Sequence, residues 1–243
     1  MSQKAEIDQA RKWIVEAKAI TVLTGAGISA DSGVPTFRGD GGLWRKYRAE
    51  DLATPEAFAD NPKLVWEWYD WRRRQLAGKR PNPGHIALTE MERRSSGFTL
   101  ITQNVDGLHD LAGSRLPLKL HGDIWNLRCT DCSARSVNRE TPLKRLPPLC
   151  DCGALLRPDI VWFGESLPQD VLEEAWSRAC AADLFLVVGT SALVQPAASL
   201  PLLARERGAR LVEINQQKTP LTAHADIALF GTAGDLLPAL VTL

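Results

Sequence analysis

Four of the five cysteines lie in two close pairs, and thiolates at this spacing are typical metal ligands. Cys129 and Cys132 form a C-x-x-C pair, and Cys150 and Cys152 form a C-x-C pair 17 residues later. This spacing is typical of a structural zinc ribbon, in which four thiolates surround the ion at about 2.3 Å and leave no open position for catalysis. The alternative is a set of buried free thiols. Cys180 lies in an apolar predicted helix, where we expect it in the core.

A glycine-rich turn follows the first apolar run of the chain. Residues 19–23 are apolar and rich in β-branched side chains, which predicts a buried strand that ends at Gly25. Gly25, Gly27 and Ala30 then match the dinucleotide fingerprint, whose glycines permit a tight turn and a close approach of the backbone to a phosphate. A glycine pair after a strand also suits a simple turn, so this spacing alone does not decide between the two interpretations.

Five further apolar runs end in polar or glycine residues and alternate with helical patterns. This alternation is typical of a parallel sheet with helices on both faces, which binds ligands at the carboxyl ends of its strands. Turn preference explains glycine, asparagine and serine at such ends, but it explains Gln103 and His121 less well. Residues 39–61 are rich in glycine and proline and predict an irregular lid. The predicted strands are 98–101, 116–120, 184–188, 210–214 and 226–230, and the predicted helices are 3–17, 62–76, 83–94, 168–181 and 196–207.

Charge and composition argue against several classes of protein. Lysine plus arginine and aspartate plus glutamate number 29 each, so no net field favours nucleic acid or an anionic membrane. The 44% of apolar residues and 24% of charged residues are ordinary for a soluble globular protein. The N-terminus lacks the apolar core of a signal peptide, and no apolar run reaches the roughly 20 residues that span a bilayer. We therefore expect a cytoplasmic protein with no membrane or nucleic-acid partner.

Several long motifs together resemble those of the sirtuins, the NAD-dependent protein lysine deacylases. The similarity follows the family's order and covers nearly the whole chain. It departs from the family at the short pair Cys150 and Cys152 and at residues 215–217, where many members have Asn-Leu-Glu. The matching motifs lie at residues 25–38, 102–109, 120–122, 157–165 and 189–191.

The resemblance implies a Rossmann-like parallel sheet with helices on both faces, plus a smaller domain with a zinc ribbon and a helical module. NAD and an acyl-lysine substrate protein would meet in the cleft between them. The implied boundaries are 1–38, 97–125 and 157–243 for the NAD-binding domain, 39–96 for a cofactor-binding loop and helical module, and 126–156 for the zinc-binding module.

The implied reaction begins when the acyl oxygen attacks C1′ of the nicotinamide ribose and releases nicotinamide. It ends with free lysine and 2′-O-acyl-ADP-ribose. His121 would act as general base through the ribose hydroxyls, and an imidazole that titrates near neutrality suits that role. His109 is the competing candidate, and the family motif around His121 decides between them. We expect His85, at a helix start, and His224, in a polar loop, to be structural or exposed.

Strand-end polar residues carry the predicted cofactor contacts. Asn104 and Asp106 would bind the departing carboxamide and hold a water, and Gln103 would reach a ribose hydroxyl. The sequence lacks an acidic residue at a strand end roughly 20 residues past the glycines, so Asn215 is the candidate for the other ribose. The predicted NAD-binding residues are Gly25, Ala26, Gly27, Ser29, Asp31, Phe37, Arg38, Gln103, Asn104, Asp106, Gly189, Thr190, Ser191, Asn215 and Ala233.

Tyr69 and Arg72 lie three residues apart in a predicted helix and therefore share a face. A phenol and a guanidinium in an apolar pocket recognise a carboxylate through charge-assisted hydrogen bonds. The pair resembles the mark of class III bacterial sirtuins, which remove succinyl and malonyl groups, and Val161 and Phe163 complete the predicted substrate contacts. The alternative is a solvated basic helix face.

Two other functions stay open from the sequence. An ADP-ribosyltransferase could use the same NAD cleft. It would be distinguished by labelled ADP-ribose that stays attached to protein. A non-catalytic zinc protein is a further possibility, against which the balanced charge and the polar strand ends both argue.

Overall fold

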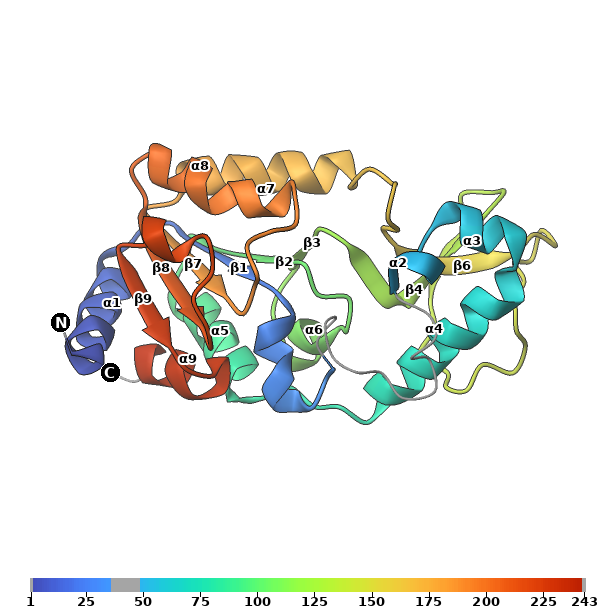
Figure 1. Ribbon diagram of the computed structural model, residues 1–243, viewed down its shortest axis with the longest axis horizontal. Coiled ribbons are helices and arrows are strands. Elements are labelled where there is room, and N and C mark those ends of the chain that lie inside the picture. The colour runs from blue at the N-terminus through green and yellow to red at the C-terminus, as the bar shows by residue number, and fades with distance from the viewer. Residues whose placement is uncertain (1, 36–48, 242–243) are drawn as a thin grey trace.

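The computed structural model describes residues 2–35 and 49–241, and its larger part is built on one parallel sheet (Figure 1). The strand order is β3-β2-β1-β7-β8-β9, and all adjacent strands run parallel. From β1 the chain adds β2 and β3 on one side of the sheet, and it later adds β7, β8 and β9 on the other side. The direction in which strands are added therefore reverses beside β1. This is the Rossmann-like sheet that was expected. Its strands are β1 (Ile20–Thr24), β2 (Phe98–Thr102), β3 (Leu118–Lys119), β7 (Leu184–Val188), β8 (Arg210–Asn215) and β9 (Ile227–Phe230).

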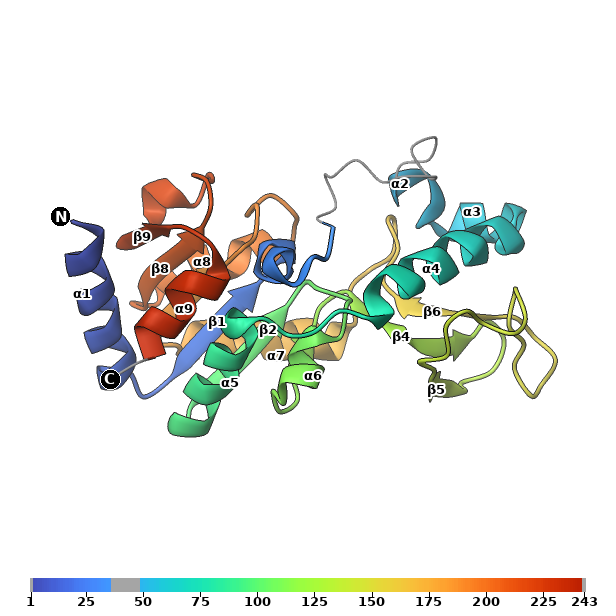
Figure 2. The same cartoon turned by 90° about the horizontal axis from the view of Figure 1, so that it is seen from below.

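Helices cover both faces of this sheet, because alternate strand residues face opposite layers. Ile20 and Val22 pack in one cluster with residues of α1, α5 and α9, whereas Leu23 packs in another with residues of α7 and α8. All residues of β1 and β7 are consequently buried, as is typical of a parallel sheet with two covered faces (Figures 1 and 2). The helices here are α1 (Gln3–Glu16), α5 (Pro83–Arg94), α6 (Leu108–Ala112), α7 (Gln169–Ala181), α8 (Leu200–Glu206) and α9 (Ala233–Val241), with short 3₁₀ helices η1 (Ala26–Ser32), η3 (Ala197–Ser199) and η4 (Thr222–His224).

A smaller unit lies at the end of the molecule's long axis that is opposite to the parallel sheet (Figure 1). Its sheet is antiparallel in the order β5-β4-β6, and α4 packs along it (Figure 2). Trp66 of α4 donates its indole N–H to the carbonyl of Leu156 at 2.7 Å, which ties the helix to β6. The elements of this small unit are α2 (Ala49–Leu52), α3 (Pro55–Asp60), α4 (Pro62–Ala77), β4 (Gly122–Cys129), β5 (Arg135–Val137) and β6 (Leu156–Ile160).

The structure corrects two predictions from the sequence. The stretch predicted to be irregular contains α2 and α3, and α3 begins where Thr54 accepts the Ala57 N–H and Pro55 takes the first helical position. The rest of the predicted lid, residues 36–48, lies outside the described residues. Cys180 is exposed on α7, because that helix buries Ala175 and Ala179 instead.

Candidate active site

The candidate site begins where the loop after β1 meets the loop after β7. Gly27 donates its N–H to the Gly189 carbonyl at 2.7 Å, and Gly25 donates to Val188 at 3.0 Å. A Cβ on Gly27 would lie 2.7 Å from the Gly189 Cα, and Gly189 itself has φ near +61°. The glycines are therefore required by contact between two main chains, a reason that the fingerprint spacing did not reveal.

The segment after β1 is a 3₁₀ helix and not the α-helix of an ordinary dinucleotide fold. Ala26 begins it, and Gly33 ends it in the left-handed conformation. Asp31 accepts the N–H of Gly234 at 3.0 Å, so this segment is held beside Ala233 at the start of α9. Two predicted cofactor contacts, Phe37 and Arg38, lie outside the described residues.

Polar side chains from three of the strand ends meet in one chain of hydrogen bonds. Gln103 donates to the Thr190 hydroxyl at 2.9 Å, and Asn215 donates to the Thr190 carbonyl at 2.8 Å. Ser191 is the next residue of the same loop and is half-buried. These amides and hydroxyls line the edge where the strand order reverses, which is the usual ligand site of such a sheet. Their donor and acceptor set fits the riboses and phosphates of a dinucleotide.

Asp106 forms a buried polar cluster with Ser29 and Asn104. The Ser29 hydroxyl donates to Asp106 Oδ2 at 2.8 Å, and Leu108 N–H donates to Oδ1 at 2.8 Å. Burial raises the pKa of this carboxyl, although both hydrogen bonds lower it. Asn104 donates to the Gly25 carbonyl at 3.0 Å and to Ser29 at 3.3 Å. The cluster joins the end of β2 to the loop after β1.

Two neutral histidines lie behind this cluster, with ring centroids 4.9 Å apart. Nδ1 of His85 accepts the Asn82 N–H at 3.4 Å, so its Nε2 carries the hydrogen and faces Ser29 at 3.4 Å. His109 Nε2 contacts the Thr24 hydroxyl at 2.9 Å. Burial lowers the pKa of His85 to about 4 and that of His109 to about 3. His85 is structural, as predicted, and His109 is a buried supporting group.

His121 occupies a different position, at the joint between the two units. Its Nδ1 lies 3.0 Å from the Gln103 carbonyl, which can only accept, so Nδ1 carries the hydrogen. The lone pair is therefore on Nε2. Burial lowers the pKa of this imidazole, which keeps it neutral near pH 7. An oriented neutral imidazole of this kind can take a proton from a hydroxyl.

Tyr69 and Arg72 are brought together on α4, as their spacing predicts. The guanidinium carbon of Arg72 lies 5.9 Å from the Tyr69 ring centroid and 4.9 Å from that of Trp68. Tyr69 is fully buried and Arg72 is half-buried, so the pair is not a solvated helix face. Burial lowers the pKa of Arg72, while Tyr69 and Asp106 raise it. The influence of Asp106 links this pair to the cluster at the sheet edge.

The segment that follows β6 borders the joint. Val161 donates its N–H to the His121 carbonyl at 3.0 Å. Phe163 donates its N–H to the Ala53 carbonyl, and the residue is 48% exposed. Trp162, between them, donates its indole N–H to the Tyr69 hydroxyl at 2.8 Å. We did not predict a role for Trp162 from the sequence, because its partner lies 93 residues away.

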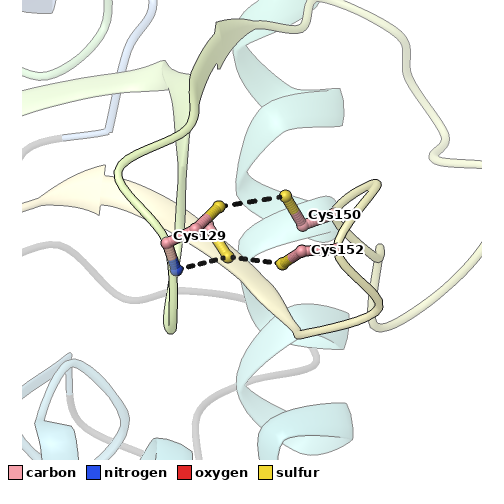
Figure 3. A group of neighbouring side chains, drawn as sticks. Cys129, Cys150 and Cys152 are labelled. Atoms are coloured by element: carbon pink, nitrogen blue, oxygen red, sulfur yellow. Dashed lines mark hydrogen bonds between the residues drawn. The ribbon is translucent and has the colours of Figure 1, made fainter.

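The four clustered cysteines meet at the tip of the small unit (Figure 3). Their sulfurs all lie within 4.8 Å of one another, with Cys129 to Cys152 at 3.5 Å and Cys132 to Cys150 at 3.7 Å. Thiolates around a tetrahedral zinc are about 3.8 Å apart, so the cluster fits this ion despite its short C-x-C pair. Main-chain N–H groups of Asp131 and Cys132 lower the pKa of Cys129, whereas neighbouring thiols raise the pKa of Cys132 and of Cys152, so the fit to zinc rests on the sulfur positions.

Comparison with known proteins identifies the family. Residues 25–196 match the Sir2 family. The NAD-dependent protein deacylase of Aquifex aeolicus is 56% identical over 209 residues, which cover 86% of this chain and 87% of that protein. This chain belongs to the Sir2 family.

Solved structures agree with this assignment to the Sir2 family. A Sir2 homologue in complex with NAD superimposes with a TM-score of 0.92 at 50% identity, covering 96% of this chain and 92% of that one. A Sir2 complex with a p53 peptide and NAD⁺ gives a TM-score of 0.85 at 32% identity, covering 98% and 96%. The names of these relatives do not favour the ADP-ribosyltransferase alternative. Among the residues described for this Sir2 protein, no helix is long and apolar enough to cross a bilayer.

Proposed function

We propose that this Sir2 protein removes acyl groups from protein lysines at the expense of NAD. Its substrates include acetyl-lysine and the acidic acyl-lysines that carry succinyl or malonyl groups. The products are free lysine, nicotinamide and 2′-O-acyl-ADP-ribose. The observation that carries the proposal is His121, whose Nδ1–H is fixed by the Gln103 carbonyl 3.0 Å away while the imidazole stands at the joint of the two units. The names of the similar proteins support NAD-dependent protein deacylation in general and do not bear on the acidic acyl groups.

When bound, NAD supplies an electrophilic ribose carbon with nicotinamide as its leaving group. We assign its binding to the edge of the parallel sheet, where main-chain amides and strand-end side chains are gathered. Asn104 and Asp106 would hold the carboxamide end, with Ser29 supporting Asp106 from a distance of 2.8 Å. Gln103 and Asn215 would hold ribose hydroxyls. The remaining proposed contacts are Gly25, Ala26, Gly27, Asp31, Phe37, Arg38, Gly189, Thr190, Ser191 and Ala233.

His121 is the proposed general base. Because its Nδ1 donates to a carbonyl, Nε2 is the only ring atom that can accept a proton from a ribose hydroxyl. Its partly buried environment keeps the ring neutral and ready to accept. A base of this kind contributes about 10²–10⁴-fold to a rate.

Arg72 and Tyr69 are proposed to bind the far end of an acidic acyl group. A guanidinium and a carboxylate form charge-assisted hydrogen bonds, which are stronger in a buried site than in water. Val161 and Phe163, which flank Trp162 at the joint, would contact the lysine stem and the peptide. Zinc on Cys129, Cys132, Cys150 and Cys152 would have a structural role only.

Mass spectrometry of lysine peptides tests this function. Acetyl, succinyl and malonyl forms of one peptide are incubated with the purified protein, with and without NAD. We expect all three acyl groups to be lost only with NAD, and one nicotinamide to be released for each lysine freed. Labelled ADP-ribose that stays attached to protein, without free lysine, would contradict the proposal.

A further inference from the structure

We infer that Trp162 determines the preference for acidic acyl groups by orienting the hydroxyl of Tyr69. The indole N–H of Trp162 donates to Tyr69 Oη at 2.8 Å, between two side chains that are at most 2% exposed. The inference rests on the proposed function of Tyr69 and Arg72. Trp162 would be a positioning residue, since it acts through the phenol and does not itself contact the acyl group.

The chemistry of the two groups fixes the direction of this hydrogen bond. An indole N–H can only donate, so the Tyr69 oxygen is the acceptor. A phenolic hydrogen lies near the ring plane and has two favoured positions. The indole hydrogen occupies one of them, and the hydroxyl hydrogen of Tyr69 is left in the other. The phenol is thereby prepared to donate to a carboxylate.

Trp162 is itself held firmly, so its donor does not adapt to each substrate. Its main-chain N–H donates to Glu165 Oε2 at 2.8 Å. The guanidinium carbon of Arg157 lies 3.2 Å from the Trp162 ring centroid, and Arg157 forms an ion pair with Glu165 at 2.6 Å. Phe58 packs on the indole at a centroid distance of 5.2 Å. These contacts orient the donor before any substrate arrives.

Tyr69 lies between Trp162 and Arg72, which makes the arrangement selective. The guanidinium carbon of Arg72 lies 5.9 Å from the Tyr69 ring centroid, so the two side chains are neighbours, and we infer that a carboxylate bound to Arg72 also accepts from the phenol. Burial raises the pKa of Tyr69 to about 12, which keeps the phenol protonated and able to donate. The methyl group of an acetyl substrate has no oxygen to accept this hydrogen. Orientation by Trp162 therefore favours acidic acyl groups alone.

The test is a double-mutant cycle with Trp162→Phe and Tyr69→Phe, assayed on acetyl and succinyl forms of one peptide. Loss of one oriented hydrogen bond of about 1 kcal/mol corresponds to about fivefold. We expect Trp162→Phe to raise KM for the succinyl peptide about fivefold, with kcat and the acetyl KM within about twofold. In the Tyr69→Phe background, Trp162→Phe should have no further effect on the succinyl KM, because the hydroxyl it orients is gone.

Trp66→Phe is the matched control, since Trp66 is also buried in the small unit and donates its indole N–H at 2.7 Å. It should affect both peptides equally. If Trp162→Phe does not fold, Trp162→3-benzothienylalanine removes only the N–H at nearly the same volume. Thermal melting of each variant distinguishes packing loss from the specific effect.

Three results would overturn the inference. They are an equal rise in KM on both peptides, no change on either, or the same rise in the Tyr69→Phe background. If Arg72→Met still lowers succinyl turnover selectively, the proposed function stands while the role of Trp162 fails. If neither Arg72→Met nor Trp162→Phe discriminates between the peptides, the acidic acyl specificity itself is wrong.

Discussion

The two sheets of this protein differ in the contacts that stabilise them. The central strands of the parallel sheet, β1 and β7, are buried along their whole length under aliphatic side chains from both helical layers. In the small unit, the strand β5 is exposed at all three residues. The first sheet is covered by apolar layers on both faces. The second packs its β4 and β6 against an apolar cluster that includes α4, and leaves its edge strand β5 exposed.

Charged side chains and thiols add directional contacts to the apolar cluster of the small unit. Arg73 of α4 is fully buried and donates to the carbonyls of Ile124, Asn138 and Glu140. Asp70, on the same helix, accepts the Leu143 N–H at 2.9 Å. The cysteine cluster closes the far end of the unit. The comparison teaches that the large unit depends on two apolar layers, whereas the small unit adds directional bonds and a cysteine cluster that fits zinc to a single apolar cluster.

Removal of zinc should therefore affect the small unit alone, and this is the largest expected effect. A structural zinc site contributes about 10 kcal/mol or more to folding. With a chelator, or in Cys150→Ser, we expect fast amide exchange in β4–β6 while β1 and β7 stay protected, as measured by hydrogen exchange with mass spectrometry. Cys180→Ser is the control, because that thiol is exposed on α7. Absence of zinc from fresh protein, or equal loss of protection in both sheets, would contradict this.

Replacement of His121 should separate chemistry from stability at the joint of the two units. His121→Ala is expected to lower kcat by about 10²–10⁴-fold, because Nε2 is the proposed proton acceptor. NAD binding, followed by calorimetry, should persist, since the strand-end side chains proposed to bind it are unchanged. His224→Ala, at an exposed position, serves as the control. Turnover close to that of the parent protein would exclude this histidine as the base.

Acid should weaken the large unit through its two buried histidines. The pKa values of His85 and His109 are lowered in the folded protein to about 4 and 3, against about 6.5 when unfolded. Between the folded and the unfolded pKa values, the unfolded chain binds more protons than the folded chain. The contribution of these histidines to the free energy of unfolding is therefore fully present above about pH 6.5 and is lost as pH decreases. Each histidine should lower the free energy of unfolding by about 2 kcal/mol at pH 5 relative to neutral pH.

Urea unfolding of His109→Gln and of the parent protein between pH 4.5 and 7.5 measures this contribution. The free energy of unfolding of the variant should depend less on pH, by a slope that corresponds to about one proton fewer taken up on unfolding. The cysteines are the same in both proteins, so protonation of zinc ligands cancels in the difference. Parallel curves would show that His109 does not contribute.

Arg72 should affect substrate choice, and its replacement should have the smallest effect on the stability of either sheet. A lost hydrogen bond to a charged group amounts to about 1.5–3 kcal/mol, or about 10–100-fold. Arg72→Met should lower kcat/KM on succinyl peptides by this factor and leave acetyl peptides within about threefold. Arg74→Met is the matched control on the same helix, because Arg74 is exposed and pairs with Asp70 at 3.2 Å. Equal losses on both peptides would rule out a carboxylate contact.

Local patterns in the sequence predicted much of the large unit. The apolar run at 184–188 and the helix at 83–94 have in the structure the bounds that the sequence predicted. Local signals work there because β7 is buried along its whole length, and α5 begins at the Asn82 cap with Pro83 in its first turn. Periodicity was wrong for Cys180, where α7 turns a face of alanines inward, and it missed α3, although Thr54 and Pro55 are a capping signal.

The site was harder to predict where contacts join distant segments. The spacing of Tyr69 and Arg72 placed them on one face, because a helix fixes neighbours three residues apart. The same arginine run gave no sign that Arg73 is buried while Arg74 is exposed. That difference arises because α4 packs against β4 and the segment at 138–140, which no local pattern encodes. The bond between Trp162 and Tyr69 has the same origin.

One residue belongs to both halves of the molecule. The His121 carbonyl accepts the Val161 N–H, and the adjoining Gly122 pairs with Ile160, so its main chain is part of the small sheet. Its ring instead donates to Gln103, just beyond a strand of the large sheet. A rotation of one half against the other would lengthen that bond and leave the imidazole free to exchange tautomers. The tautomer of the proposed base therefore depends on how the two halves are aligned. A molecule with rotated halves would lose its base, and so its activity, while it could still bind substrate.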